Sequence, residues 1–320
     1  MALKANHPRN QHTTPQYLLR NFADSRGHVY VFDKATERVF PCSTRNVGAE
    51  SHFYDFRDAN GEAQTLEYFM GDVEDRAAGV LRNILERESL AGLTEEERTD
   101  LSIFVAVQQL RVPGARHWLR SFTVALRSEL EQRGIDPGGV VPEMSEADVK
   151  LETLRQIGIA KESSQYIFDK VWVLNRAPPG TNFYISDNPV TQHNSTREKN
   201  SPGAGTGAAS FGVEIYLPLS PTYSLLMYCR RAWRILAAAV DAPIPTDTRE
   251  AIEIVNAART GSPITVDPPN VGHQNARQVN WASRFLISAD GDFDFVRRML
   301  RDYPTLKRPR EVAIWGGVGS

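Results

Sequence analysis

The chain has 320 residues, of which 41% are hydrophobic, 24% charged and 9% aromatic. This composition is typical of a globular protein and excludes disordered and fibrous chains, and the length allows one elaborate domain or two smaller ones. Lysine and arginine together number 37, against 39 for aspartate and glutamate. The formal net charge of −2 therefore gives no overall electrostatic reason to expect nucleic acid or an anionic membrane as a partner.

The first ten residues contain no apolar segment of the kind found in signal peptides, which favours a cytoplasmic location. The longest apolar stretch, 235–240, is far too short to cross a bilayer, so membrane insertion is not expected. Cys42 and Cys229 are too few for a disulfide framework or a thiolate zinc site and fit a reducing compartment. Each is interpreted as a packed or surface thiol rather than as a nucleophile.

The first elements predicted along the chain are a short helix, a β-hairpin and a long helix. The segment HTTPQYLLRNF predicts a short helix that docks by its apolar residues, and residues 28–40 alternate aromatic and β-branched residues around the turn sequence DKATE. Between Gln64 and Leu90 the apolar residues recur at helical spacing, which predicts an amphipathic helix. These residues are Leu66, Phe69, Met70, Val73, Ala77, Val80, Leu81 and Ile84.

A second long helix is predicted to begin after Thr94, which is followed by three glutamates, the pattern of an N-cap with an acidic first turn. Pro113 is expected to kink or interrupt this helix before it resumes towards Arg133. A third helix is expected over residues 145–160.

After the third helix the period changes to that of strands. The β-rich runs, separated by Pro, Gly and Asn, cover 166–175, 182–186, 213–219 and 223–229. Two more helices are expected over 250–258 and 273–282, and a last strand over 284–288. Because the helices precede most of the strands, we predict an α+β fold in which a helical N-terminal half packs on a mixed or antiparallel sheet from the C-terminal half.

The predicted domain organisation is a single domain over residues 1–320. It comprises a mainly helical part at 1–162 that includes the hairpin, a mainly β part at 163–306, and a tail at 307–320 rich in basic residues, Gly and Pro. The Gly-rich segment 197–212 lacks the spacing of a phosphate loop and does not lead into a helix. It is interpreted as a mobile loop or lid.

Two glutamates on the helix predicted over 64–90 are candidate metal ligands. Glu67 and Glu74 are one heptad apart and project at nearly the same angle, on the edge of the apolar stripe. Half-buried carboxylates need partners such as an arginine, a metal ion or backbone donors. The alternative is that both are boundary residues that reach solvent.

A polar amide interrupts the apolar face of the second long helix. Gln108 projects into the middle of that face, and Arg111 flanks it one turn further on. An unpaired buried amide costs on the order of 1–3 kcal/mol, so Gln108 is expected to have a specific hydrogen-bond partner. A structural tie to neighbouring backbone and a role in a site are both consistent with this pattern.

Asp187, Asn188 and His12 complete the set of candidate site residues. Asp187 and Asn188 end the run predicted as a strand over 182–186, which places a carboxylate and an amide at a sheet rim, where sites are often assembled. An Asx turn that caps the strand explains the same two residues. His12 is a candidate acid–base group, and a packed or capping histidine is the alternative. The sequence contains neither paired metal-ligand histidines of the HExxH type nor a GxSxG elbow.

In the order of its motifs, the chain resembles a bacterial family of proteins of unknown function, domain-of-unknown-function family 4238. The resemblance runs from about His12 to Ser288 and rests on HTTPQYLLRNF, HVYVFDK, STRNVGAESHFYDF, the helix with Gln108 and Arg111, the Trp172 strand with YISDNPV, and LPLSP. The resemblance implies that the family-pattern positions are His12, Pro15, Leu19, Phe22, Phe53, Tyr54, Gln108, Arg111, Ser186, Asp187, Asn188, Pro189, Pro218 and Asn280. It implies no reaction. Gln11 stands where a second histidine or a basic residue would support a two-histidine metal site.

The leading hypothesis is an intracellular hydrolase, such as a metal-dependent nuclease, acting on nucleic acid or a small phosphate-containing molecule. His12 would act as general base or metal ligand, and Arg111 would hold an anionic group, with Gln108 and Asn188 completing the site. Asp187 together with Glu67 or Glu74 would hold a divalent metal ion that activates water.

The second hypothesis is a non-catalytic binding or regulatory module, in which the same polar residues form a buried structural network. A third is an enzyme that acts on a small molecule or peptide without metal, with Asp187 as acid or base. Under the module hypothesis, alanine at His12 or Asp187 lowers the melting temperature; under the enzyme hypothesis it abolishes activity and leaves stability almost intact.

Overall fold

The helices and strands are described for residues 9–58, 60–194, 207–242 and 249–310 of a computed structural model. Within these residues the helices are α1 (Gln16–Arg20), α2 (Glu67–Arg87), α3 (Glu95–Leu110), α4 (Pro113–Gln132), α5 (Glu146–Phe168), α6 (Arg230–Asp241), α7 (Arg249–Thr260), α8 (Pro268–Trp281) and α9 (Asp294–Asp302), with 3-10 turns at Pro137–Gly139 and Pro304–Lys307. The strands are β1 (Asn10–His12), β2 (His28–Asp33), β3 (Arg38–Ser43), β4 (Ala49–Ser51), β5 (Asp55–Arg57), β6 (Ala63–Thr65), β7 (Val171–Arg176), β8 (Ile185–Ser186), β9 (Thr191–Asn194), β10 (Val213–Pro218), β11 (Tyr223–Tyr228), β12 (Ile264–Thr265) and β13 (Phe285–Ser288).

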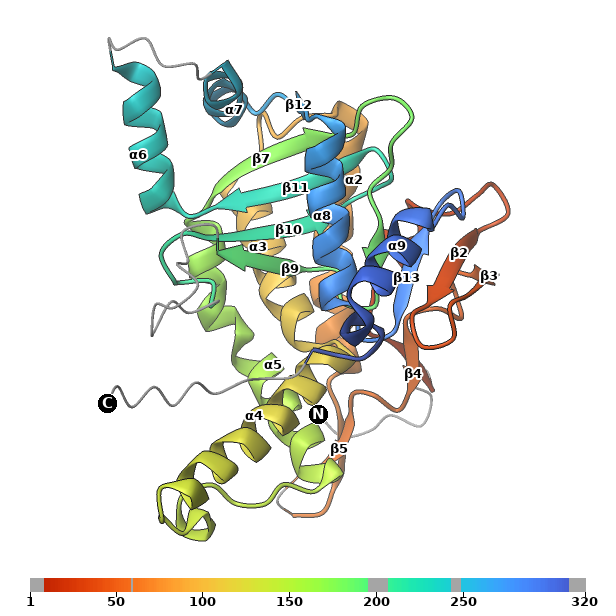
Figure 1. Cartoon of the computed structure of the whole chain (residues 1–320), viewed down its shortest axis with the longest axis vertical. Coiled ribbons are helices and arrows are strands. Elements are labelled where there is room, and N and C mark those ends of the chain that lie inside the picture. The colour runs from red at the N-terminus through yellow and green to blue at the C-terminus, as the bar shows by residue number, and fades with distance from the viewer. Residues whose placement is uncertain (1–8, 59, 195–206, 243–248, 311–320) are drawn as a thin grey trace.

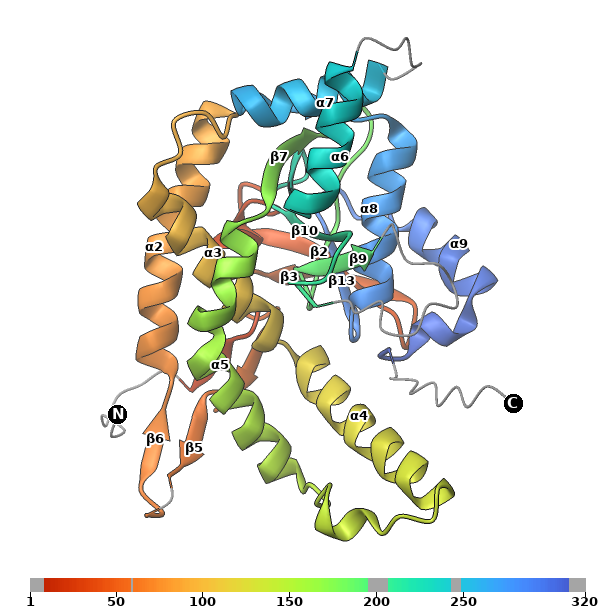
Figure 2. The same cartoon turned by 90° about the vertical axis from the view of Figure 1, so that its left-hand side faces the viewer.

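A five-stranded sheet in the order β12-β7-β11-β10-β9 lies at the centre of the molecule. Its β12–β7 pair is parallel and its other pairs are antiparallel, so the sheet is mixed. Figure 1 shows α8 crossing one face of this sheet, and Figure 2 shows α2, α3 and α5 on the other side. A four-stranded antiparallel sheet has the order β3-β2-β13-β8. The predicted α+β fold class is therefore confirmed.

The two faces of the central sheet differ in polarity. On β10, Ile215 and Leu217 are fully buried in the main hydrophobic core, which they share with α2, α3 and α5. Successive strand residues point to opposite faces, so Glu214 and Tyr216 point the other way, towards α8. The helical layer thus covers an apolar face, and α8 covers a polar one.

The predicted interruption at Pro113 is confirmed, and it is a complete break between two helices. α3 ends at Leu110, Arg111 has φ −86° and ψ 19°, and Val112 is extended, with φ −104° and ψ 152°. A residue that precedes proline avoids the helical region, and proline is tolerated at the first position of a new helix. Arg111 therefore stays at the buried end of α3, while α4 leaves the body in a new direction (Figure 2).

The N-terminal predictions largely hold. The β2–β3 hairpin is present, and Leu18, Leu19 and Phe22 around the predicted short helix are fully buried. The cap of α3 is also as predicted: Thr94 Oγ accepts a hydrogen bond from Glu97 N at 3.1 Å, and the Glu97 carboxylate accepts one from Thr94 N at 2.9 Å.

Several predicted boundaries are wrong. Residues 166–175 are not one strand, because α5 continues to Phe168, with Ile167 in the core, and β7 begins only at Val171. Residues 182–186 contribute only the two residues of β8, since Tyr184 N donates to the side chain of Asn275 at 2.8 Å rather than to a neighbouring strand. Element boundaries depend on such tertiary contacts and are the least certain part of a sequence prediction.

Helices α6 and α9 and the short strands β1, β4, β5, β6, β9 and β12 were not predicted. The division into a helical first half and a β-rich second half holds only roughly, because α6, α7, α8 and α9 follow β11 in the described part of the chain. Of the predicted loop at 197–212, positions 197–206 lie outside the described residues, as does the predicted tail beyond position 310. No helix in the described ranges is both long and apolar enough to cross a bilayer.

Candidate functional site

The segment around His12 is held by backbone and amide hydrogen bonds. Gly48 O accepts from Thr13 N at 2.7 Å and from Thr13 Oγ at 3.1 Å. The side chain of Gln11 is fully buried; its oxygen accepts from Tyr54 N at 2.6 Å, and its nitrogen donates to the carboxylate of Asp55 at 3.0 Å. These contacts fix the first strand against the segment that precedes α2.

Arg111 is the centre of a buried polar network. Its side chain is fully buried, donates through Nε to Gln108 Oε1 at 2.6 Å and pairs through Nη1 with Glu74 Oε1 at 2.5 Å. Gln108 Nε2 in turn donates to the carbonyl of Thr13 at 2.9 Å. The prediction that Gln108 needs a specific partner is therefore confirmed, and the structure supplies an arginine as the partner of Glu74.

Burial and the Glu74 carboxylate set the electrostatics of this network. Burial on its own lowers the pKa of Arg111, but Glu74 and then Tyr54 more than offset it, so the pKa lies above its usual value. Burial also raises the pKa of Tyr17 well above its usual value and that of Tyr54 to about 12. At neutral pH Arg111 therefore stays charged, and the phenols of Tyr17 and Tyr54 stay neutral.

His12 borders the network and is half-buried. Burial is the main reason why its pKa is lowered, while the backbone of Thr44 and the Glu74 carboxylate act in the opposite direction. Tyr54 Oη donates to the His12 carbonyl at 2.8 Å. The imidazole is therefore held in place by its backbone and is neutral at physiological pH.

Three side chains in and around this network have buried polar atoms that lack hydrogen-bond partners among the described residues. They are His12 Nε2, Tyr17 Oη and Arg111 Nη2. Both His12 and Tyr17 have charge interactions with Arg111 and Glu74, which places all of them in one neighbourhood. We call these residues, His12, Tyr17, Tyr54, Glu74, Gln108 and Arg111, the arginine network.

Asp187 belongs to a different cluster, at the start of β13. Its carboxylate accepts three backbone N–H groups, from Ser283 at 2.8 Å, Arg284 at 2.7 Å and Phe285 at 3.0 Å. Burial lowers the pKa of the nearby Lys34 to about 8, and the charge of Asp187 acts in the opposite direction. Burial raises the pKa of Asp187, and the three backbone amides oppose that effect. Every oxygen of Asp187 is thus used to hold backbone.

Asn188 and its neighbours are used in the same way. Asn188 Nδ2 donates to the carbonyl of Trp281 at 3.2 Å, and Ser186 Oγ donates to Gln278 Oε1 at 2.7 Å. Gln278 Nε2 donates to Pro189 O at 2.9 Å. Asp187 and Asn188, the acid and amide predicted at the strand end, therefore connect the segment after β8 to β13 and to the end of α8.

The predicted metal-ligand set of Glu67, Glu74 and Asp187 is not assembled. Glu74 is paired with Arg111, Asp187 is held by backbone amides, and Glu67 lies at the first turn of α2, where it interacts with Tyr54. Among the residues that the structure describes, no three His, Cys, Asp or Glu side chains are grouped so that they could hold a metal ion. The structure thus corrects this prediction: similar helical angles for the two glutamates did not bring them to Asp187.

Segments that are far apart in the sequence nevertheless meet around one hollow of about 340 Å³. It lies between the HTTP segment, the NVGAE segment, the start of α4 and the SDNP segment. Residues that line it include Thr13, Val47, Gly48, Pro113, Asp187 and Ser283. We call this cavity the motif hollow.

A model of the family described as "Protein of unknown function (DUF4238)" matches residues 10–292. The chain belongs to this family. The motif hollow and the arginine network both lie within the part of the chain that this family model covers. Searches among curated proteins and among solved structures found no significant match.

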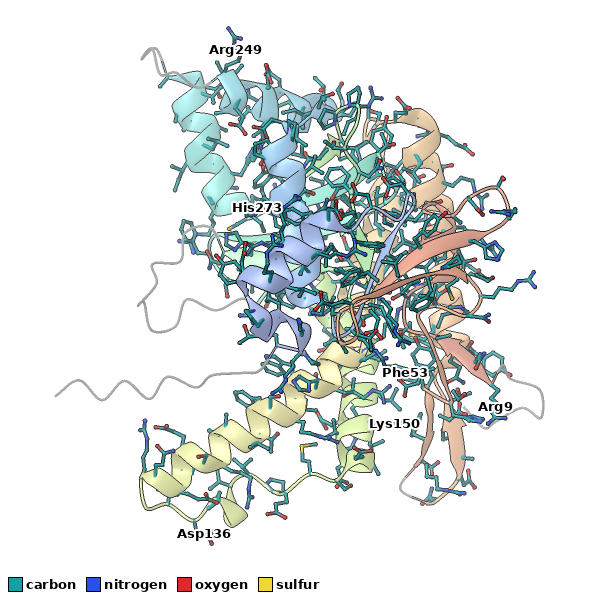
Figure 3. The ribbon with its side chains drawn as sticks, turned by 45° about the vertical axis from the view of Figure 1, so that its right-hand side comes forward. Arg9, Phe53, Asp136, Lys150, Arg249 and His273 are labelled. Atoms are coloured by element: carbon teal, nitrogen blue, oxygen red, sulfur yellow. The ribbon has the colours of Figure 1, made fainter. Side chains whose placement is uncertain are left out.

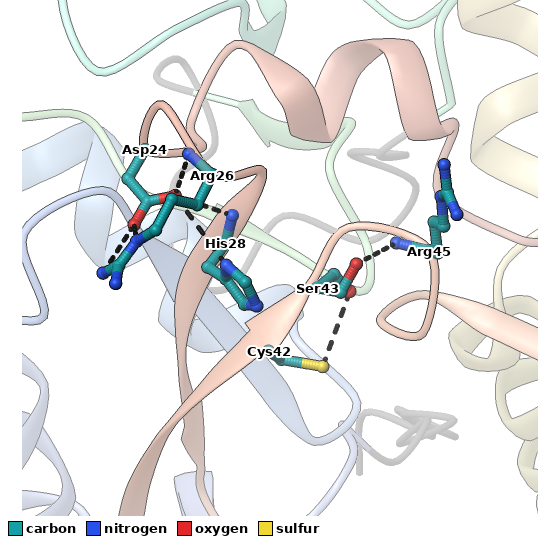
Figure 4. Close-up of polar contacts among 6 residues, drawn as sticks. All are labelled: Asp24, Arg26, His28, Cys42, Ser43 and Arg45. Atoms are coloured by element: carbon teal, nitrogen blue, oxygen red, sulfur yellow. Dashed lines mark hydrogen bonds and ion pairs between the residues drawn. The ribbon is translucent and has the colours of Figure 1, made fainter.

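Sequence reasoning missed a group of arginines beside His12 in this DUF4238 protein. A hollow of about 470 Å³ is lined by Arg20, Arg26, Arg45, Asp24 and Thr44, and we call it the arginine hollow. Figure 4 shows Arg26 held by Asp24 on one side and the Arg45 side chain on the other, beyond Ser43. Within the described residues the Arg45 guanidinium has no acidic partner. The three arginines are scattered over positions 20–45, so no motif marked them.

The backbone conformation and close surroundings of Gly48 predict that a side chain at this position lowers stability. Gly48 has φ +67°, and a Cβ there would lie 3.0 Å from Thr14 Cβ, whereas a Cβ on Gly27, with φ +77°, meets nothing within 4 Å. Gly48→Ala is expected to lower the free energy of unfolding by about 2–3 kcal/mol, and Gly27→Ala by about 1 kcal/mol, as measured by urea denaturation. Equal losses in the two variants would show that the segment around Thr14 moves freely.

Proposed function

We propose that this DUF4238 protein is a hydrolase that acts on a phosphate-containing substrate, with His12 as its acid–base group. Arg111 and Tyr17 would contact the phosphoryl group, and the arginine hollow would hold further negative charge of the substrate. The proposal assigns Asp187, Asn188 and Gln108 to positioning, because their polar atoms are engaged with backbone or with Arg111.

The observation that carries this proposal is the set of unpartnered atoms in the arginine network. A buried polar atom without a partner costs about 1–3 kcal/mol, so a purely structural network would be expected to satisfy His12 Nε2, Tyr17 Oη and Arg111 Nη2. A bound anionic group accepts hydrogen bonds from the guanidinium and the phenol, and Nε2 of a neutral imidazole accepts a proton. The Glu74 side chain is 23% exposed, so the network reaches solvent at this ion pair.

The chemistry that follows is general acid–base hydrolysis. His12 Nε2 takes a proton from water, and the hydroxide attacks phosphorus while the phosphorus–oxygen bond to the leaving group breaks. The imidazolium then returns the proton to the leaving oxygen. Arg111 offsets the negative charge that builds up on the phosphoryl oxygens.

The arginine hollow supports the choice of a phosphate-containing substrate. Arg20, Arg26 and Arg45 line it, against the single carboxylate of Asp24. The His12 ring lies against the backbone of Thr44 and Arg45, which also line this hollow. Guanidinium groups bind phosphate through two parallel hydrogen bonds, so substrate phosphates could be held next to the acid–base group.

The proposal is tested with His12→Gln. Hydrolysis of bis(p-nitrophenyl) phosphate, p-nitrophenyl phosphate and labelled RNA and DNA oligonucleotides is measured for the wild type and the variant. His12→Gln is expected to lower kcat about 100-fold or more on the substrate that is cleaved, with an almost unchanged melting temperature. Activity of the wild type should rise with pH and be half-maximal below pH 6.5, because the pKa of His12 is lowered and the imidazole must be neutral to act as the base.

His117→Gln on α4 is the control and should keep full activity. His117 lies outside the motif hollow, the arginine hollow and the arginine network. Unchanged cleavage by His12→Gln, or no cleavage of any of these substrates by the wild type, contradicts the proposal. A large drop in the melting temperature of His12→Gln indicates instead that His12 is a structural residue.

The second candidate function is a non-catalytic binding module, and one observation favours it. Gln108, Asp187 and Asn188 all make hydrogen bonds that join separate segments of the chain, as members of a structural network do. A module of this kind would bind its partner through the arginine hollow. It predicts that Arg45→Glu abolishes binding of a phosphorylated partner while no phosphate ester is hydrolysed.

A further inference from the structure

The face of the central sheet that α8 covers carries a second group of polar residues. His193 on β9 lies directly across from Glu214 on β10, and Thr191 lies across from Tyr216. Directly paired residues on neighbouring strands point to the same face, so all of these side chains are turned towards α8. None of them belongs to the arginine network.

Helix α8 places two further groups over this face. The rings of His273 and His193 are 5.4 Å apart between centroids, at 67°, and the rings of His273 and Tyr216 are 6.0 Å apart. Arg277 lies one turn after His273, with Nη1 3.2 Å from His193 Nδ1. Figure 3 labels His273 on this helix.

Buried atoms in this group also lack hydrogen-bond partners in the described part of the chain. They are Arg277 Nε and Thr191 Oγ. Thr191 is fully buried, so its hydroxyl does not reach bulk water. A buried guanidinium N–H and a buried hydroxyl are both able to donate to an anion.

The charges of the group leave Arg277 as its cation. Burial, followed by Arg277 and His193, lowers the pKa of His273 to about 4. Burial and Arg277 lower the pKa of His193, and the Glu214 carboxylate acts in the opposite direction. Tyr216 donates a hydrogen bond to the Glu214 carboxylate. At neutral pH both imidazoles are therefore neutral, and each has one N–H to donate.

We propose that Arg277, His193 and His273 form a binding site for the carboxylate or phosphate group of a small molecule, between α8 and the polar face of the central sheet. The ligand anion would take the N–H groups of Arg277 and of the two imidazoles, with Thr191 as a further donor. A metal ion fits less well, because the Arg277 cation lies within hydrogen-bond distance of His193. The site is independent of the hydrolase proposed at His12.

The test uses the full chain with inorganic phosphate, pyrophosphate, citrate and Zn²⁺ as separate probes. Histidine ring signals are followed by NMR over a pH titration, and binding is measured by calorimetry. A bound anion stabilises the protonated imidazoles, so binding is expected to raise the pKa of His273 and His193 by at least one unit. Binding of citrate alone identifies a carboxylate ligand, and binding of phosphate or pyrophosphate alone identifies a phosphate ligand.

Arg277→Gln is expected to weaken binding at least 10-fold, and His273→Gln provides a second variant in case the first is unstable. Arg297→Gln on α9 is the control and should bind as the wild type does, because Arg297 pairs with the nearby Asp294 and lies over the Phe32 ring, away from the proposed site. The proposal is overturned if no probe shifts the two histidines, if the shift persists in Arg277→Gln, or if only Zn²⁺ shifts them. His12→Gln should leave this binding unchanged, which separates the result from that of the hydrolase test.

Discussion

Asp187→Ala is expected to lower the free energy of unfolding by about 3–5 kcal/mol. The carboxylate accepts the backbone N–H groups of three successive residues at the start of β13, and alanine leaves all three without their acceptor. The same change removes a carboxylate whose charge stabilises the protonated form of Lys34, and the Lys34 side chain is fully buried. Urea denaturation followed by circular dichroism measures the loss.

Asp187→Asn separates charge from hydrogen bonding, because the amide keeps one oxygen that can accept from the backbone. Its expected loss is intermediate. Asp302→Ala on α9 is the control, since this carboxylate is 63% exposed and should change stability little. If Asp187→Ala unfolds at the wild-type urea concentration and loses only activity, Asp187 belongs to the catalytic site and its structural assignment is wrong.

Glu74→Gln is expected to lower the free energy of unfolding by about 3–5 kcal/mol, although it only replaces one carboxylate oxygen by an NH2 group. The reason is the partner: Arg111 is fully buried and stays charged, so removing the carboxylate leaves a cation in the core without its counter-charge. The loss is measured by urea denaturation. Glu86→Gln, at an exposed position on the same helix, should leave stability unchanged.

A double-mutant cycle makes this prediction sharper. Combining Glu74→Gln with Arg111→Met removes both charges, and an apolar side chain of similar length replaces the guanidinium. The double variant is expected to be more stable than Glu74→Gln alone, because the uncompensated cation is gone. If the stability losses of the single variants Glu74→Gln and Arg111→Met add up to the loss of the double variant, the stabilisation does not come from the ion pair.

The candidate residues were predictable one at a time, and their grouping was not. Helical projection indicated that Gln108 is buried and needs a partner, and the structure provides that partner in Thr13 O. The same projection put Glu67 and Glu74 on one side of the helix. It could not show that Arg111, 37 residues further along the chain, forms an ion pair with Glu74. A helical angle defines a face of one helix, whereas a site requires the faces of several elements to meet.

The histidines illustrate the same limit. His193 and His273 are 80 residues apart and fit no metal-ligand spacing, so the sequence offered no reason to pair them. Strand register and the crossing of α8 bring their rings to 5.4 Å. Likewise, Arg26 and Arg45 line one hollow because the pairing of β2 with β3 brings the residues before His28 next to those after Ser43.

The sequence by itself determined the α+β class, the β2–β3 hairpin, the cap at Thr94, the break at Pro113 and membership of the DUF4238 family. These features depend on local patterns such as hydrophobic period, capping chemistry and the backbone restriction imposed by proline. Only the tertiary structure decided that Asp187 holds backbone, that Glu74 pairs with Arg111, and that His12 lies beside that pair. Such partners are far apart in the chain, and burial selects them by hydrogen bonding and charge, which no local pattern records.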